Sequence, residues 1–212
     1  MRKFLYFIGL IQLWPFLIFF KTKTYYEDGG RKNKRIKGGA VIISNHRSFM
    51  DGVVIALKFF FKRLRFLVVD SYFQNGRRKL LKFIVKTAGG IFVGKDGRSF
   101  DYIEKTKRAA AKGDAVLIFP EGDFTFTDGP AEFTAGYIVL AIKTGAKIVP
   151  VVNDFNYGLF KRVHIMIGNA IDLSGWSGVE LTKERLKEIN GEISEKYLSL
   201  FHKLQSKKAE RL

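Results

Sequence analysis

The chain has 212 residues, with 37 Lys and Arg against 20 Asp and Glu, which gives a formal net charge of +17. This length suits one domain of ordinary size with its own core, or at most two small domains. Hydrophobic residues make up 47% of the sequence, which excludes a disordered polycation. The absence of cysteine excludes disulfides, thiolate metal ligands and a cysteine nucleophile, and three histidines are too few for a histidine-rich metal site.

The positive charge is concentrated in the first part of the chain. Residues 1–86 contain 19 Lys and Arg but only four acids, a net charge of +15, whereas residues 87–212 have a net charge of +2. This distribution indicates a polyanionic partner, which can be nucleic acid or an anionic membrane. Composition alone does not choose between these two classes of partner.

Residues 4–20 are apolar except for Gln12 and have Lys and Arg on both sides. A helix of this length measures about 26 Å, slightly less than the roughly 30 Å hydrocarbon core of a membrane, and Pro15 interrupts it. We therefore expect a kinked, half-inserted membrane anchor. Aromatic side chains favour the membrane interface, and those available here are Tyr6, Trp14, Tyr25 and Tyr26.

Three other interpretations of this apolar segment stay open. It can be a membrane-spanning helix, or a buried core helix that would have to pack many aromatic residues and a glutamine. It can also be a cleaved signal peptide, although no small-residue cleavage site follows the apolar run.

Two further basic segments favour a membrane over nucleic acid. Residues 31–37 (RKNKRIK) form a polybasic run after the anchor, an arrangement that binds anionic lipid headgroups. Residues 58–66 (KFFFKRLRF) mix Phe with Lys and Arg, which combines apolar insertion into a membrane with attraction to lipid phosphates. Taken alone, this segment also fits binding to single-stranded nucleic acid, or a charged surface whose Phe residues point into the core. No RNA-binding, helix-turn-helix or zinc pattern accompanies these segments, so we expect no nucleic-acid partner.

Short apolar runs alternate with longer amphipathic segments beyond the basic run. The short runs are rich in β-branched residues and predict strands at residues 40–44, 65–69, 90–93, 115–119, 147–152 and 163–167. The longer segments predict helices at residues 51–61, 77–88, 99–113 and 134–145. Residues 181–208 have apolar residues at helical spacing and predict a terminal amphipathic helix packed on the domain.

Continuous apolar strands that alternate with helices indicate an α/β fold, with a mixed, mostly parallel sheet covered by helices on both faces. The N-terminal membrane-anchoring helical segment precedes this domain. We assign residues 1–37 to the anchor and polybasic loop, and residues 38–212 to the α/β domain, which ends in the terminal amphipathic helix.

His46 and Asp51 follow the first predicted strand, in the sequence NHRSFMD. The carboxyl ends of strands are where α/β proteins gather functional groups. Histidine suits proton transfer near neutral pH, and an Asp on the next helical turn can accept from Nδ1–H, which leaves Nε2 as a base. The spacing alone is equally compatible with a turn histidine and an Asp that caps the helix.

A turn with the sequence Phe119-Pro120-Glu121-Gly122 follows the strand predicted at residues 115–119. Pro and Gly force the turn, which leaves the Glu121 carboxylate projecting from the carboxyl end of the strand. Because this strand belongs to the same expected sheet as the strand before His46, both groups can face one cleft.

Four ordered segments resemble the sequence blocks of the glycerolipid acyltransferase family, whose best-known members are the 1-acylglycerol-3-phosphate acyltransferases. The segments are NHRSFMD, GGIFVGKDGRS, FPEGDFTFTDG and KIVPVV, and they extend over roughly residues 40–152. The first and third are specific in combination, whereas the second and fourth are weak alone. The apolar, basic N-terminal segment is similar to the membrane-binding segment of that family.

The resemblance implies a membrane-associated O-acyltransferase. His46 would be the general base for the hydroxyl of an acceptor, with Asp51 orienting it. The acceptor oxygen would attack the thioester of acyl-CoA or acyl-carrier protein directly, which agrees with the absence of Cys and of a G-x-S-x-G motif. No cofactor and no metal are expected. The implied substrate-binding residues are Lys95, Arg98, Phe119, Pro120, Glu121 and Gly122.

The chain departs from the family pattern at the expected phosphate site. Family members commonly have Thr-Arg-Ser after Pro-Glu-Gly, where the Arg binds the acceptor phosphate, whereas this chain has Asp123-Phe124-Thr125. Thr134-Ala135 stand where a basic pair often precedes a glycine. A phosphate-binding cation is therefore missing and an acid is present, although Lys95 and Arg98 in the second block can compensate.

The expected reaction transfers a fatty acyl group to a lysophospholipid, with 1-acylglycerol-3-phosphate giving phosphatidate as the first choice. A non-phosphate lipid or glycan acceptor, and a catalytically inactive lipid-surface protein of the same fold, are the alternatives. We expect the protein at the cytoplasmic face of a membrane, with anionic lipids, the lysophospholipid and the acyl thioester or acyl-carrier protein as partners. His164, in a predicted strand, and His202, on the terminal helix, are expected to be structural.

Overall fold

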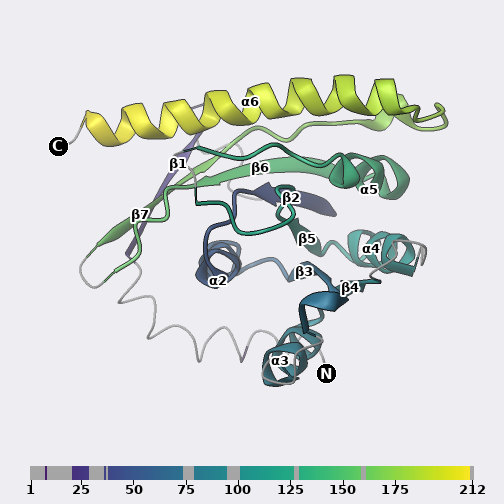
Figure 1. Cartoon of the computed structure of the whole chain (residues 1–212), viewed down its shortest axis with the longest axis horizontal. Coiled ribbons are helices and arrows are strands. Elements are labelled where there is room, and N and C mark those ends of the chain that lie inside the picture. Colours follow the sequence, from purple (N-terminus) through teal and green to yellow (C-terminus); the bar gives the residue numbers. More distant parts are fainter. Residues whose placement is uncertain are drawn as a thin grey trace.

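A seven-stranded sheet with the order β1-β7-β6-β2-β5-β3-β4 forms the centre of the molecule (Figure 1). The computed structural model describes residues 8, 21–28, 36, 38–73, 79–94, 101–126, 129–158 and 161–210. Among the described strands, β6 and β7 pair antiparallel and the other neighbours pair in parallel. The strands are β1 (Lys21–Tyr26), β2 (Ala40–Ser44), β3 (Leu64–Val69), β4 (Ile91–Val93), β5 (Ala115–Ile118), β6 (Lys147–Asn153) and β7 (Arg162–Ile167).

Five helices and two short 3-10 helices surround the sheet in the described part of the chain. The 3-10 helices are η2 (Asp70–Phe73) and η4 (Ser174–Trp176). The longer helices are α2 (Phe49–Lys58), α3 (Lys79–Ala88), α4 (Asp101–Ala111), α5 (Gly136–Thr144) and α6 (Lys183–Ala209). All five longer helices, and every strand except β1, lie where the sequence predicts them, with ends that differ by three residues or fewer.

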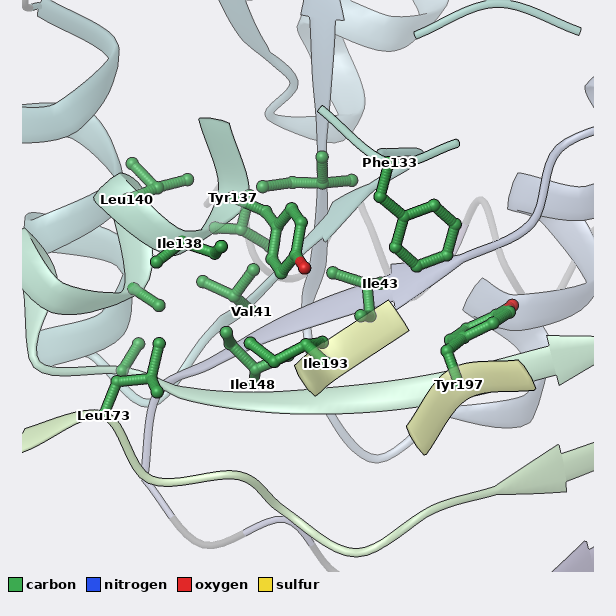
Figure 2. Close-up of a cluster of buried hydrophobic side chains, with 14 of the residues drawn as sticks. Val41, Ile43, Phe133, Tyr137, Ile138, Leu140, Ile148, Leu173, Ile193 and Tyr197 are labelled. Atoms are coloured by element: carbon green, nitrogen blue, oxygen red, sulfur yellow. The ribbon is translucent and has the colours of Figure 1, made fainter. Parts of the chain in front are cut away.

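The central strands are apolar on both sides, so helices cover both faces of the sheet. All five residues of β2 are buried, and Ile43 points toward one face while Ile42 points toward the other. Helices α4, α5 and α6 pack over the first face, where Figure 2 shows Ile43 near Tyr137 of α5 and Tyr197 of α6. Helix α2 packs over the second face. The predicted fold, a mostly parallel mixed sheet between helices, is confirmed.

Helix α6 lies along β6 and β7 at the edge of the first face (Figure 1). Thr182 caps its start, where the hydroxyl accepts from the N–H of Arg185 at 3.3 Å. The helix approaches β7 closely because Gly168 has no side chain; a Cβ there would lie 2.4 Å from Leu200. As predicted, its buried residues repeat at helical spacing: Ile189, Ile193, Tyr197, Leu200 and Leu204.

Strand β1 is the main element that the sequence does not predict. The sequence places residues 21–26 between the anchor and the basic run, with Tyr25 and Tyr26 at a membrane interface. Instead they pair in parallel with β7, and Tyr25 and Tyr26 pack against the cores on opposite faces of the sheet. The strand begins with the polar sequence Lys-Thr-Lys-Thr. An edge strand with so few apolar residues shows no alternation of apolar and polar residues, so the sequence does not predict it. The predicted division of the chain into an anchor segment, residues 1–37, and an α/β domain, residues 38–212, otherwise stays a prediction.

The predicted anchor at residues 4–20 and the basic run at residues 31–37 lie outside the described residues, apart from Ile8 and Ile36. Among the helices that the structure describes, none has the length and apolar character needed to span a membrane. Within residues 58–66, Phe59 is buried whereas Phe61 is 87% exposed. The Phe residues of this segment are therefore divided between core and surface.

Candidate active site

The candidate site lies at the carboxyl ends of β2, β5 and β6. β2 ends at Ser44, and the buried Asn45 leads into His46. The N–H of Asn45 donates to the Tyr197 hydroxyl at 2.8 Å, and its Nδ2 donates to the carbonyl of Asn153 at 2.8 Å. Its Oδ1 accepts from the N–H of Asn153 at 2.9 Å. These bonds fix the backbone immediately before His46.

His46 and Asp51 form the pair that the sequence predicts. Nδ1 of His46 lies 3.1 Å from Oδ2 of Asp51. An ionised carboxylate only accepts hydrogen bonds, so this contact favours the tautomer with its proton on Nδ1 and leaves Nε2 as the basic nitrogen. Asp51 is fully buried, and its Oδ2 also accepts from the backbone N–H groups of Arg47 and Ser48, both at 2.7 Å. Asp51 and Ser48 form a capping box at the start of α2, so Asp51 is both a helix cap and the partner of His46.

Two phenylalanines of the loop after β5 contact the imidazole ring. Phe119 stacks on it with centroids 3.7 Å apart and planes at 8°, and Phe124 contacts it at 4.3 Å and 37°. The N–H of Thr125 donates to the His46 carbonyl at 2.7 Å, which ties the same loop to the histidine backbone. The side chain of His46 keeps 17% of its surface exposed, so the packed ring remains accessible.

The Pro-Glu-Gly turn directs Glu121 toward His46. Oε2 of Glu121 accepts from the N–H of His46 at 3.4 Å, and Gly122 takes a φ of 81°, which favours glycine. Burial raises the pKa of Glu121, while hydrogen bonds from Thr125 and His46 oppose this effect. Oε1 is buried, and no donor among the described residues lies in hydrogen-bonding geometry to it. This oxygen can therefore accept from a bound substrate.

The turn beside His46 contains four of the six predicted substrate-binding residues, namely Phe119, Pro120, Glu121 and Gly122, and their role in binding stays a prediction. The Pro120 carbonyl accepts from the N–H and the hydroxyl of Thr134, both at 2.9 Å, which ties the turn to the segment before α5. Asp123 is exposed, and its carboxylate accepts from the N–H of Phe124 at 2.7 Å. Lys95 and Arg98 lie outside the described residues.

Several polar residues of the site were not predicted. Asn153, at the end of β6, and Tyr157, in the following loop, both donate to Oδ1 of Asp51. Tyr197 reaches Asn45 from α6. A polar residue that ends a buried apolar strand is a signal that could have indicated Asn153, whereas no local pattern singles out Tyr157 or Tyr197.

The other two histidines lie apart from the His46 and Asp51 pair. Nδ1 of His164 lies 2.9 Å from Oδ2 of Asp154, whose buried carboxylate also pairs with Nζ of Lys208 at 2.9 Å. This cluster ties β7 to the end of α6, while His202 is exposed on α6. Their structural role stays a prediction. Within the described ranges, no group of three or more His, Cys, Asp or Glu is placed to hold a metal ion.

The family model described as Acyltransferase matches residues 26–154 of this sequence. The match covers more than half of the chain and contains His46, Asp51 and Glu121. The chain therefore belongs to the acyltransferase family, and the predicted acyltransferase is confirmed.

A solved structure with the same fold is that of the 1-acyl-sn-glycerophosphate (LPA) acyltransferase, PlsC, from Thermotoga maritima. The two structures superpose with a TM-score of 0.62 at 19% sequence identity, and the match covers 93% of this chain and 80% of that chain. At this identity, the likeness is evidence of the fold that the two proteins share.

Proposed function

We propose that this acyltransferase moves a fatty acyl group from a thioester to the hydroxyl of a lysophospholipid at a membrane surface. The observation that carries the proposal is the contact between His46 and the buried Asp51, beside the carboxylate of Glu121. A histidine held by a buried carboxylate is suited to general base catalysis, because the carboxylate stabilises the imidazolium that forms.

In this reaction Nε2 of His46 takes the proton of the acceptor hydroxyl while the hydroxyl oxygen attacks the thioester carbonyl carbon. A C–O bond forms and the C–S bond breaks. The imidazolium then returns its proton to the leaving thiolate. The chain contains no Cys that could carry an acyl group, so direct transfer is the simplest course.

The proposed acceptor is 1-acylglycerol-3-phosphate, which gives phosphatidate, and the proposed donor is acyl-CoA or acyl-carrier protein. The order of the sequence blocks and the fold shared with an LPA acyltransferase support this acceptor. Because Nε2 of His46 takes the proton of the acceptor hydroxyl, Oε1 of Glu121 would accept from another donor group of the bound substrate. Lys95 and Arg98 remain the proposed cations for its phosphate.

A phosphate-free acceptor is the second candidate, and Phe124 favours it. Its ring packs on His46 at the position where family members commonly carry the phosphate-binding Arg. An aromatic ring offers a phosphate no positive charge, whereas it offers apolar contact to an acyl chain or the face of a sugar.

Helix α3 supports membrane association from within the described residues. Phe83 and Ile84 are 66% and 53% exposed. Lys79 and Lys86 are also exposed, and their spacing from Phe83 places all three on one side of the helix. A face that combines exposed apolar and cationic side chains fits an anionic lipid surface. We propose that this α3 face contacts the cytoplasmic leaflet together with the predicted anchor.

The test is a thiol-release assay with the full chain, acyl-CoA and acyl-carrier protein as donors, and acceptors with and without phosphate. We expect release with lysophosphatidate, and a loss of about a hundredfold or more in His46→Ala. His202→Ala is the matched control, because His202 is exposed on α6, and it should keep the wild-type rate. An active His46→Ala variant, or no release with any acceptor, would contradict the proposal.

A further inference from the structure

The two oxygens of the buried Asp51 carboxylate have different partners. Oδ2 accepts from His46 and from two backbone N–H groups of its own loop. Oδ1 faces the end of β6 and the loop after it instead: Nδ2 of Asn153, the last residue of β6, donates to it at 3.3 Å, and the phenol of Tyr157 in the loop donates a second hydrogen bond. A local motif thus holds one oxygen, and a distant loop holds the other.

We propose that Tyr157 is a positioning residue for acyl transfer, because its phenol O–H fixes Oδ1 of Asp51 and so keeps Oδ2 directed at Nδ1 of His46. This inference rests on the proposed function, in which His46 is the general base. Tyr157 acts through Asp51 and needs no contact with substrate.

The surroundings of Tyr157 keep its phenol protonated and oriented. Burial and the adjacent Asp51 charge raise the pKa of Tyr157 far above its ordinary value, so the phenol keeps the proton that it donates. Nδ2 of Asn153 donates to the phenol oxygen at 2.5 Å, which leaves the O–H to point toward Asp51. The ring packs against the core under α2, which limits its movement.

The loop that presents Tyr157 is itself held in an unusual conformation. Phe155 has a φ of 55°, a region that residues other than glycine seldom adopt. Its N–H donates to Oδ1 of Asn153 at 3.0 Å, and the guanidinium of Arg47 lies 4.8 Å from the centre of its ring. The N–H of Tyr157 donates to the Phe155 carbonyl at 2.7 Å. Strained backbone of this kind is typical of functional sites, where the surrounding structure maintains it.

Tyr157 lies beyond the segments that indicate the family. The four sequence blocks end at residue 152, and the family match ends at residue 154. The inference therefore rests on the contacts of Tyr157 in this structure and not on the family pattern.

The test compares Tyr157→Phe with Tyr137→Phe. Tyr137 is also a buried tyrosine, but its hydroxyl donates to Asn190 at 2.9 Å, away from Asp51, so this variant controls for the loss of a buried hydroxyl. The first measurement is the titration of the His46 imidazole by NMR, with its signals assigned by their absence in His46→Ala. This titration needs no substrate, so it tests the positioning role of Tyr157 even if the proposed function is wrong.

In Tyr157→Phe we expect the His46 titration midpoint to move to higher pH, because a carboxylate with one donor fewer holds the imidazolium more strongly. The other charged groups near His46, Arg47 and Glu121, are the same in both variants. We also expect kcat to fall about tenfold, the effect of one hydrogen bond to a charged group, with KM little changed. The acid side of the rate profile should move to higher pH.

Tyr137→Phe should change neither the titration nor the pH profile. An unmoved His46 midpoint in Tyr157→Phe, or equal shifts in both variants, would overturn the inference. If the His46 midpoint moves in Tyr157→Phe but the wild-type chain transfers no acyl group, the positioning role of Tyr157 is supported and the proposed function is rejected.

Discussion

The hydroxyl of Tyr197, on α6, accepts a hydrogen bond of 2.8 Å from the backbone N–H of Asn45, the residue before His46. The same hydroxyl lies 2.9 Å from the carbonyl oxygen of Val151 and 3.0 Å from Oδ1 of Asn45. The terminal helix therefore contacts the backbone that presents the candidate base, in addition to covering the core.

Replacing this hydroxyl should weaken the fold. We expect Tyr197→Phe to lower the free energy of unfolding by about 1–3 kcal/mol, because the N–H of Asn45 loses its buried acceptor. Urea unfolding measures the change. Leu198→Ala is the control, since Leu198 is 43% exposed on the same helix and should shift stability by less than about 0.5 kcal/mol. Equal losses in both variants would be inconsistent with a specific role for the hydroxyl.

Glu121 should destabilise the folded chain at neutral pH. Because burial raises its pKa in the fold, the native state holds the proton more tightly than the unfolded state does. The free energy of unfolding therefore falls as the pH rises from 4.5, the ordinary pKa of the Glu121 carboxyl, through its raised pKa in the fold. We expect Glu121→Gln to be more stable than wild type in urea at pH 7, and little different at pH 4.

Glu132→Gln serves as the control for Glu121→Gln because Glu132 is exposed on the same loop, and it should have the same small effect at both pH values. If Glu121→Gln is no more stable than wild type at pH 7, the buried carboxylate has no such energetic effect. An accompanying loss of acyl transfer would associate the carboxylate with the acceptor.

Phe124→Arg should change the preference among acceptors. The substitution puts a cation where family members commonly have one, so KM for a phosphate-bearing acceptor should fall while KM for a phosphate-free acceptor stays the same or rises. Initial rates with matched acceptor pairs measure this. The exposed Phe126, 77% of whose surface is accessible, offers a control in Phe126→Arg. Equal effects of the two variants on KM would indicate a general effect of added charge.

The α3 face should enter a lipid surface. The chain has no cysteine, so Phe83→Cys gives a single site for a polarity-sensitive fluorophore. We expect its emission to shift to shorter wavelength with vesicles of phosphatidylcholine and phosphatidylglycerol, and to change much less with phosphatidylcholine alone. Val179→Cys, at a position that is 38% exposed outside α3, is the control. The same response at both positions would argue against a specific α3 contact.

The sequence predicts the central sheet well because its strands are buried on both faces and appear as continuous apolar runs. β2 and β6 are examples, each ending beside a functional residue. The contact between His46 and Asp51 is also local, since the two residues are five positions apart, but their spacing alone fits a turn histidine and a helix-capping Asp equally well.

The remaining contacts of the site depend on topology. Tyr157 and Asp51 are 106 residues apart, and Tyr197 and Asn45 are 152 residues apart. Neither tyrosine differs in its local sequence from an ordinary core residue. β1 was missed for the same reason. Its polar residues form a strand by pairing with β7, which is distant in the sequence, and their local pattern does not indicate one.

The pairing of β1 with β7 also affects the order in which the chain can fold during synthesis. Lys21 lies opposite Arg162, so an early segment finds its partner only after most of the polypeptide has left the ribosome. Contacts between distant segments close slowly, and the exposed strands of an unfinished sheet are prone to aggregation. A nascent chain that stops before β7 and α6 leaves β1 unpaired and Asn45 without Tyr197. We therefore expect the nascent chain to depend most on chaperones just before residues 162–209, which contain β7 and α6, emerge from the ribosome.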